Sequence, residues 1–241
     1  MNTSLTAVER RGTAIRSGAL ALALLFCAGP ALAAKKDGLY YLDKTTAESL
    51  QKDFAKPPAP GSEEEKADFA AVLDWQGRRT AAQCAAAEAQ KKAVFDEFFP
   101  GGDNPFGKTP PQAEKILKKT LNDISRVYDG IKNSAKRPRP FRARTECRPC
   151  ISLPGSFYSY PSGHAARSML YALILSDLLP DAKGKFMADA GQAGENRVIG
   201  GVHFPSDVKA GQELAAQVHA ELLKKENFRK DLESLRKYLS K

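Results

Sequence analysis

The clearest helical pattern in the chain lies in residues 110–132, PPQAEKILKKTLNDISRVYDGIK. Proline is favoured in the first turn of a helix, and apolar side chains then recur at intervals of three and four residues. These apolar positions are Leu117, Leu121, Ile124, Tyr128 and Ile131. The spacing predicts an amphipathic helix that turns this stripe toward the core and carries Lys132 at its carboxyl end.

Three segments further along the chain also have helical character. Ser162 precedes an apolar run that ends at Leu179-Pro180, Pro205 introduces a second run, and a more polar one follows Asn227. Serine is a good helix N-cap and proline fits the first turn, so each segment is predicted to be a helix. The apolar positions of the first two runs are Met169, Leu170, Leu173, Ile174, Leu178, Leu214, Val218 and Leu222.

The amino-terminal half has fewer periodic signals. Ser62 and Glu65 have capping-box spacing, and the alanine-rich residues 80–98 keep a helical composition up to Pro100. Residues 35–54 are expected to form an extended arm that ends in a proline-rich turn. Because strand-like alternation is nearly absent, the sequence predicts an all-α, single-domain helical bundle.

The first 33 residues have the composition of a secretory signal peptide. Arginines precede an uncharged stretch at residues 18–28, and Ala31-Leu32-Ala33 offers small residues at cleavage spacing. The alternative, a membrane anchor, is disfavoured because the apolar run is short and is broken by Gly29-Pro30. The expected product is a periplasmic protein of residues 34–241 without a membrane span.

The charge balance favours anionic partners. The whole chain carries a formal charge of +9, and loss of residues 1–33 leaves about +7. Basic and acidic residues are interspersed and no nucleic-acid-binding motif is present, so small phosphorylated substrates are expected rather than nucleic acid. The sequence leaves a homo-oligomer open.

Three cysteines follow the signal peptide: Cys84, Cys147 and Cys150. In an oxidising compartment Cys147 and Cys150 could pair with each other, or either could pair with Cys84. A lone C-x-x-C motif is weak evidence for zinc, and no metal site is expected.

Two of the three histidines occupy unusual settings. His164 follows Pro161-Ser162-Gly163, and His203 lies six residues after Arg197 and four before Asp207. If Ser162 begins a helix, the N–H groups of Gly163 and His164 are free to bind an anion such as phosphate. His219 falls in the middle of a predicted helix, where a structural role at the helix surface or boundary is expected.

The order Lys132-x6-Arg139-Pro140, Pro161-Ser162-Gly163-His164 and Arg197-x5-His203-x3-Asp207 resembles the three-part signature of the type 2 phosphatidic acid phosphatase superfamily. This superfamily includes bacterial non-specific acid phosphatases and vanadium haloperoxidases. The resemblance to class A bacterial acid phosphatases extends to residues 39–42, 57–61 and 75–78, and therefore covers nearly the whole mature chain.

The resemblance implies a helical fold of the haloperoxidase type and a metal-free, cofactor-free phosphatase site. It implies that His203 attacks phosphorus, that Asp207 fixes the tautomer of His203, and that His164 protonates the leaving group. The phosphate-binding residues that it implies are Lys132, Arg139, Ser162, Gly163 and Arg197.

One position departs from the superfamily pattern, because Asn196 stands where serine usually precedes the arginine. Asparagine still forms hydrogen bonds, so a modest effect on the site is expected. The alternative functions are a vanadium haloperoxidase, since vanadate would fit the same cationic cage, and a lipid phosphate phosphatase.

Overall fold

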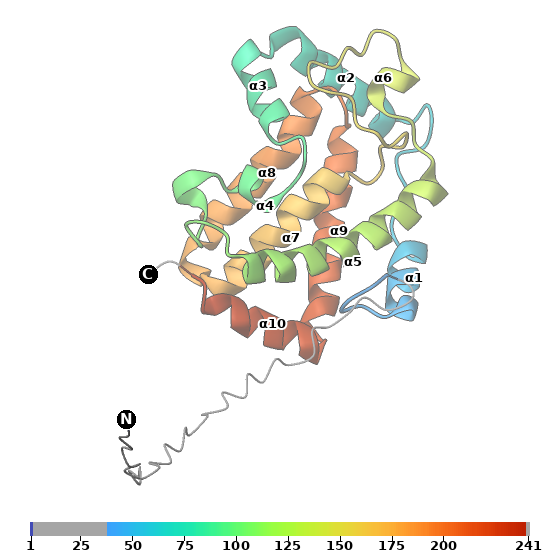
Figure 1. The fold of residues 1–241 in the computed structure, drawn as a ribbon. Coiled ribbons are helices and arrows are strands. Elements are labelled where there is room, and N and C mark those ends of the chain that lie inside the picture. The colour runs from blue at the N-terminus through green and yellow to red at the C-terminus, as the bar shows by residue number, and fades with distance from the viewer. Residues whose placement is uncertain (2–37, 240–241) are drawn as a thin grey trace. The chain divides into compact units, whose positions relative to one another are not determined.

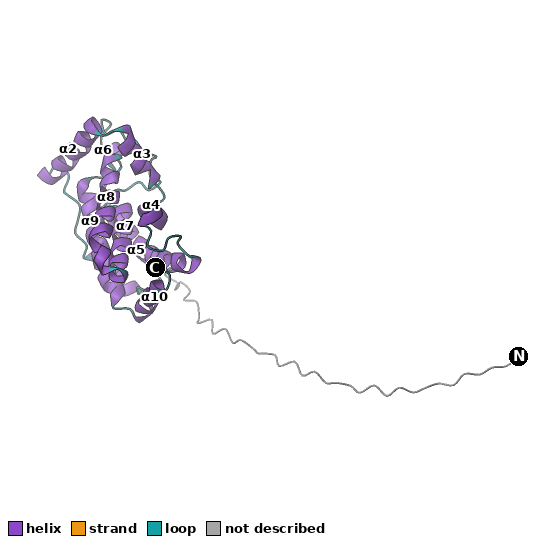
Figure 2. Cartoon of the chain, turned by 90° about the vertical axis from the view of Figure 1, so that its left-hand side faces the viewer, coloured by secondary structure: helices purple, strands orange, loops and turns teal. Residues whose placement is uncertain are grey.

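The computed structural model describes Met1 and residues 38–239. The predicted signal peptide, residues 1–33, lies outside the described residues except for Met1. All regular structure in the described part is helical (Figure 2), which confirms the all-α prediction. In chain order the elements are α1 (Lys44–Lys52), α2 (Glu63–Arg78), α3 (Ala81–Ala89), α4 (Phe95–Phe98), η1 (Gly101–Asp103), α5 (Pro111–Ala135), α6 (Pro140–Ala143), α7 (Gly163–Leu178), η2 (Pro180–Ala182), α8 (Lys183–Ile199), α9 (Pro205–Leu223) and α10 (Glu226–Arg236).

Helix α7 lies at the centre of the helical unit and packs along both α8 and α9 (Figure 1). It has buried residues on nearly all sides, as expected for a helix enclosed by others. Short connections make α8 run antiparallel to both α7 and α9, so α7 and α9 run in the same direction. The start of α7, the end of α8 and the start of α9 therefore lie at one end of the unit.

Helix α5 confirms the strongest sequence pattern. It begins at Pro111, and its apolar stripe is buried in the main core apart from Leu121, which is half-buried. The helix ends at Ala135, where Lys136 adopts a left-handed conformation with a φ of 49°. This ending places Lys132 in the last turn of α5.

Residues 38–54, the described part of the predicted extended arm, do not form an arm, because α1 lies within them. Asp43 caps α1 by accepting a hydrogen bond from the N–H of Thr46 at 2.8 Å. The Asp123 carboxylate of α5 accepts hydrogen bonds from the backbone N–H groups of the preceding segment. This short helix is held by these capping and tertiary contacts, which were not recognised from the sequence.

Two further differences concern the region before α5 and helix α8. The alanine-rich helix stops at Ala89, and only the four-residue α4 follows before Pro100. Helix α8 was not predicted because its three glycines obscure the helical pattern. One of them is needed for packing, since a Cβ at Gly194 would lie 2.7 Å from Cγ1 of Val208 on α9. Among the described helices, none is long and apolar enough to cross a lipid bilayer.

Candidate active site

The helix ends described above surround a cavity of about 550 Å³. Lys132 comes from the end of α5, Arg139 from the loop before α6, and Arg197 from the last turn of α8. Six of the eight sequence-predicted site residues line this cavity: Lys132, Arg139, Gly163, His164, Arg197 and His203. The other two, Ser162 and Asp207, are fully buried next to it.

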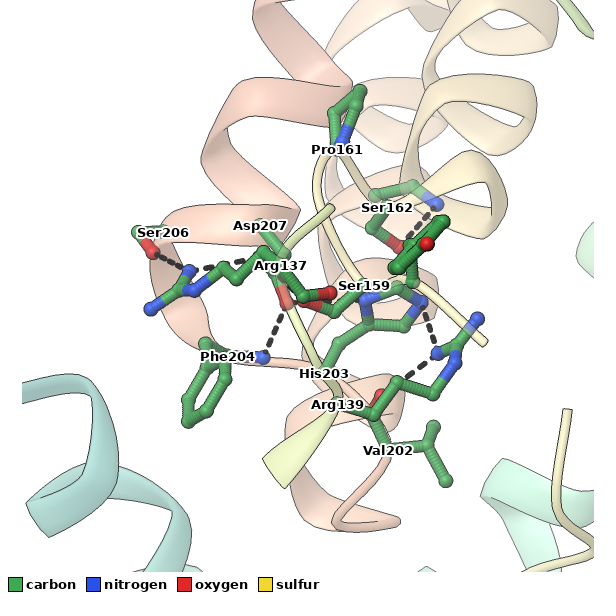
Figure 3. A network of polar contacts seen from close by, with 12 residues as sticks. Arg137, Arg139, Ser159, Pro161, Ser162, Val202, His203, Phe204, Ser206 and Asp207 are labelled. Atoms are coloured by element: carbon green, nitrogen blue, oxygen red, sulfur yellow. Dashed lines mark hydrogen bonds and ion pairs between the residues drawn. The ribbon is translucent and has the colours of Figure 1, made fainter. Parts of the chain in front are cut away.

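His203 lies between a carboxylate and a guanidinium (Figure 3). Its Nδ1 is 3.2 Å from Oδ2 of Asp207, and its Nε2 is 2.9 Å from Nη1 of Arg139. The turn that opens α9 brings Asp207 back toward His203, and the Asp207 carboxylate also accepts the N–H of Phe204 at 2.9 Å. The predicted pairing of His203 with Asp207 is therefore present in the structure.

These contacts determine which nitrogen of His203 carries the proton. A guanidinium can only donate, so Nε2 must accept and the proton lies on Nδ1, facing Asp207. Burial, followed by the charges of Arg139 and Lys132, holds the pKa of His203 well below its ordinary value. His203 is thus neutral, with the lone pair of Nε2 on the cavity side.

Arg137 supports Asp207 from the other side. Its Nη1 donates to Oδ1 of Asp207 at 2.8 Å, and its Nη2 donates to Oδ2 of Asp68 on α2 at 2.7 Å. Burial raises the pKa of Asp207, whereas the ion pair with Arg137 opposes that rise. Asp68 also accepts hydrogen bonds from the backbone and the hydroxyl of Ser206, so this ion-pair chain fixes the start of α9.

Sequence reasoning missed Arg137 and Asp68. Arg137 stands two residues before Arg139 in the Arg-Pro-Arg-Pro stretch, and nothing in that pattern distinguishes a buried arginine from a solvated one. Asp68 is 4% exposed in the middle of α2. The available signal was an acidic residue within the apolar face of that predicted helix.

Lys132 is held by backbone oxygens. Its Nζ donates to the carbonyls of Pro161 at 2.6 Å, Ser159 at 3.0 Å and Tyr158 at 3.3 Å. Burial, and then the charge of Arg139, lower the pKa of Lys132 to about 7. The charge of its ammonium group is consequently more sensitive to a rise in pH than the charges of Arg139 and Arg197, whose pKa values are about 10.

The two arginines are anchored in the same manner. Arg139 donates through Nη1 to the carbonyl of Val202 at 2.8 Å and through Nε to the carbonyl of Ser156 at 2.9 Å. Arg197 donates to the carbonyl of Ala87, while its buried Nε has no hydrogen-bond partner among the described residues. Burial is the main cause that lowers the pKa of each to about 10, so both guanidinium groups stay charged near neutral pH.

His164 begins α7 and faces the same cavity. Its ring packs edge-on against Phe98 with centroids 4.9 Å apart, and its buried Nε2 has no hydrogen-bond partner among the described residues. Burial, Arg197 and His203 hold the pKa of His164 well below its ordinary value. An arriving anion would favour the protonated form, because it would offset these positive charges.

Ser162 is the N-cap of α7, as predicted. Its hydroxyl accepts a hydrogen bond from the N–H of Ala165 at 3.3 Å, and its own N–H donates to the carbonyl of Asp207 at 2.8 Å. Within the described residues, the N–H groups of Gly163 and His164 have no intrahelical acceptor, as at any helix start. A phosphate contact from the Ser162 side chain stays a prediction, since that side chain does not line the cavity.

Asn196 and His219 both lie outside the cavity lining. The side chain of Asn196 donates to Gln90 at 2.9 Å and accepts from Gln192 at 3.0 Å, so it joins α8 to the end of α3. His219 is 9% exposed, with Nε2 2.7 Å from Oδ2 of Asp177. His219 is therefore a buried residue that joins α9 to α7, which fits the predicted structural role but not a place at the helix surface.

A disulfide braces one wall of the cavity. It joins Cys84 of α3 to Cys150, and it leaves Cys147 free and buried, which selects one of the pairings that the sequence left open. Residues 152–156, here called the rim segment, follow this bond and line the cavity. Glu88 of α3 also accepts two hydrogen bonds from Ser152 of the rim segment, at 2.7 and 2.8 Å.

The chemistry that this cavity can perform depends on fixed positive charge and two imidazoles. Among the described residues, no group of three or more His, Cys, Asp or Glu side chains is placed to hold a metal ion. Phosphoryl transfer spreads negative charge over three equatorial oxygens, which cationic side chains at fixed positions can stabilise.

The chain is similar in sequence to a known protein family and to several phosphatases. A family model described as the PAP2 superfamily matches residues 120–228. A non-specific acid phosphatase of Salmonella typhimurium is 30% identical over 210 residues, which cover 80% of this chain and 82% of that protein. An acid phosphatase of Zymomonas mobilis is 35% identical over 138 residues, and this match covers 54% of the chain and spans 51% of that relative.

Two solved structures have a similar fold. A bacterial vanadium-dependent iodoperoxidase aligns with a TM-score of 0.56 at 15% identity, covering 78% of this chain and 55% of the other. A transmembrane PAP2-type phosphatidylglycerolphosphate phosphatase from Bacillus subtilis aligns with a TM-score of 0.50 at 19% identity. This alignment covers 75% of this chain and 92% of the other. These two structures show that the fold is shared. The family model, together with the Salmonella relative, which matches over most of both proteins, shows that the chain belongs to the PAP2 superfamily.

Proposed function

We propose that this chain is an acid phosphatase that hydrolyses phosphate monoesters through a phosphohistidine on Nε2 of His203, without a metal ion. The observation that carries the proposal is the neutral His203, whose Nε2 lone pair faces a cavity lined by Lys132, Arg139 and Arg197. The similarity to bacterial acid phosphatases supports the same activity.

In the first step the lone pair of Nε2 attacks phosphorus and the bond to the ester oxygen breaks. Nδ1–H remains hydrogen-bonded to Asp207, whose charge stabilises the imidazole ring as it becomes positive. The Arg139 guanidinium turns from Nε2 to a phosphate oxygen as the nitrogen–phosphorus bond forms. The three cations then balance the charge on the equatorial oxygens.

His164 supplies and recovers the proton. It protonates the leaving oxygen in the first step and so releases an alcohol. In the second step it takes a proton from water, whose oxygen attacks phosphorus while the bond to Nε2 breaks. The balanced result is an alcohol and inorganic phosphate from one ester and one water.

The direct test replaces His203 with alanine. We expect kcat for p-nitrophenyl phosphate to fall by more than about a hundredfold, because nucleophilic attack is lost. Rapid quenching of the wild-type protein should trap an acid-labile phosphohistidine that the variant lacks. His219→Ala is the matched control, since His219 lies outside the cavity; more than a few per cent residual turnover in His203→Ala would refute the nucleophile.

A parallel set of assays separates the alternative functions. Hydrolysis should persist in EDTA and be inhibited competitively by vanadate, because the cations rather than a metal bind the phosphate. Bromide oxidation by peroxide and vanadate, in the absence of ester hydrolysis, would favour a haloperoxidase instead. Release of phosphate from lipid phosphates alone would favour a lipid phosphatase.

A further inference from the structure

The cavity has more positive charge than one phosphate group requires. Six cationic side chains line it against one carboxylate, Asp129: Lys91, Lys92, Lys132, Arg139, Arg167 and Arg197. The proposed phosphate cage uses Lys132, Arg139 and Arg197. Of the remaining three, Lys91 pairs with Glu88 at 3.0 Å, which leaves Arg167 and Lys92.

Arg167 lines the cavity without a close ion pair among the described residues, and the charge of its nearest acidic neighbour in the lining, Asp129, is shared with Lys132 and Arg126. Its Nη2 donates to the hydroxyl of Ser125 at 3.2 Å, and its guanidinium carbon lies 5.7 Å from the centre of the Tyr128 ring. Its Nε is buried without a hydrogen-bond partner, and no ion pair forms on Arg167 within the described residues. An unpaired buried donor is costly, and an anionic ligand would remove that cost.

Lys92 is presented to the same cavity by a firmly held loop. Glu97 of α4 accepts hydrogen bonds from the backbone N–H groups of Lys92 and Ala93, both at 2.9 Å. Ala93 is a non-glycine residue with a φ of 53°, a backbone conformation that persists only when surrounding contacts impose it. The exposed side chain of Lys92 forms no ion pair within the described part of the chain.

The position of Arg167 indicates which part of a substrate it would meet. It follows His164 by three residues on α7, so the two side chains share a face and lie about 4.5 Å apart along the helix axis. His164 is the proposed proton donor to the leaving oxygen. Arg167 therefore lies on the side of the cavity where the alcohol part of the ester departs.

We propose that Arg167 and Lys92 form a second anion-binding subsite, which favours phosphate monoesters whose alcohol part carries a carboxylate or a second phosphate. The inference rests on the proposed phosphatase function and names its preferred substrate class. A second anion would pair with cations that the reacting phosphate does not reach. Binding of the second anion at this subsite would lower KM more than it changes kcat, because the subsite lies away from the reacting atoms.

The test compares butyl phosphate, the bisphosphate of butanediol and the phosphate ester of hydroxybutanoic acid on the purified mature chain. These aliphatic esters have similar leaving groups but differ in the second charge. We expect kcat/KM of each doubly anionic ester to exceed that of butyl phosphate by about tenfold, the usual size of one charge-assisted hydrogen bond. Arg167→Met and Lys92→Met should each lower this ratio, mainly through KM, and Arg167→Lys should retain part of it.

Lys183→Met is the matched control, because it removes one positive charge at the start of α8, far along that helix from Arg197. Its ratio should equal that of the wild type. A wild-type ratio near one, or a ratio unchanged in both Arg167→Met and Lys92→Met, would overturn the subsite while butyl phosphate turnover still supports the phosphatase. Failure to hydrolyse any of the three esters would instead overturn the proposed function, and the subsite with it.

Discussion

Arg137 connects the proposed nucleophile to α2, because its guanidinium pairs with both Asp207 and Asp68. Arg137→Met leaves two buried carboxylates without their cation, so the free energy of unfolding should fall by about 3–5 kcal/mol. Since His203 then loses its fixed orientation, kcat should fall by about a hundredfold while KM changes little. Steady-state kinetics below the melting temperature and urea unfolding measure both effects. Partial recovery of kcat in Arg137→Lys is expected, and an unaltered kcat in Arg137→Met would show that Asp207 positions His203 alone.

The pKa of Lys132, lowered to about 7, makes phosphate binding depend on pH. As pH rises through about 7 the ammonium group loses its proton, so the cage loses a charge and KM should rise. The pKa of His164 is also held below its ordinary value, so the protonated form that acts as the acid is present only at lower pH. As pH rises, kcat should therefore fall while KM rises. A kcat/KM profile from acidic to alkaline pH measures this decline. Lys132→Gln should raise KM at acidic pH and flatten its rise near neutrality; a wild-type KM that is constant across this range would contradict the assignment.

The residues of the candidate site could be predicted because their order and spacing resemble the three-part signature of the superfamily, and each part of that signature is a short stretch of sequence. Lys132 with Arg139, and His203 with Asp207, are close in sequence, and the structure places them in or beside one cavity. Arg137 could not be recognised, because its two carboxylate partners are about 70 residues away in either direction. Only the folded chain brings those charges together.

At the scale of elements, the disulfide between α3 and Cys150 determines how firmly the rim segment is held. In the double variant Cys84→Ala/Cys150→Ala the free energy of unfolding should be about 2–4 kcal/mol lower, because the unfolded chain is no longer constrained by a cross-link that spans 66 residues. KM for phosphate esters should rise as well, since Ser156 of the rim segment anchors Arg139. Chemical denaturation under oxidising conditions and initial-rate kinetics measure these changes. Cys147→Ala is the control for loss of a buried thiol, and equal stability of the double variant and this control would contradict the bracing role.

Helices with a long apolar run or a capping signal were predicted, whereas α1 and α8 were not. Helices α5, α7, α9 and α10 have apolar or capping signals that fix their place in the chain. Helix α1 depends instead on the Asp43 cap and on packing against α5, and α8 depends on glycines that allow close contact with α9. These contacts join segments that are far apart in the sequence, so the spacing of apolar residues within one segment does not predict them.

At the scale of the whole molecule, we propose that the chain is exported to the periplasm with cleavage after Ala33. The arginines before an apolar run support export, and the Cys84–Cys150 disulfide is suited to an oxidising compartment. Mass spectrometry of protein from the periplasmic fraction should find Ala34 as the amino terminus. Deleting residues 2–33 should leave the protein in the cytosol with its cysteines reduced; an intact amino terminus in the exported protein would contradict cleavage.

The cations of the cavity also hold the chain together, since Lys132, Arg139 and Arg197 donate to backbone carbonyls of distant segments. A substitution at any of them would therefore enlarge the unfolded fraction that cellular proteases remove, and a change of about 1–2 kcal/mol alters abundance several-fold. A cell that expresses such a variant would thus hold fewer copies of the protein, each of them slower. Its loss of phosphate release would exceed what kinetics on equal amounts of purified protein indicate.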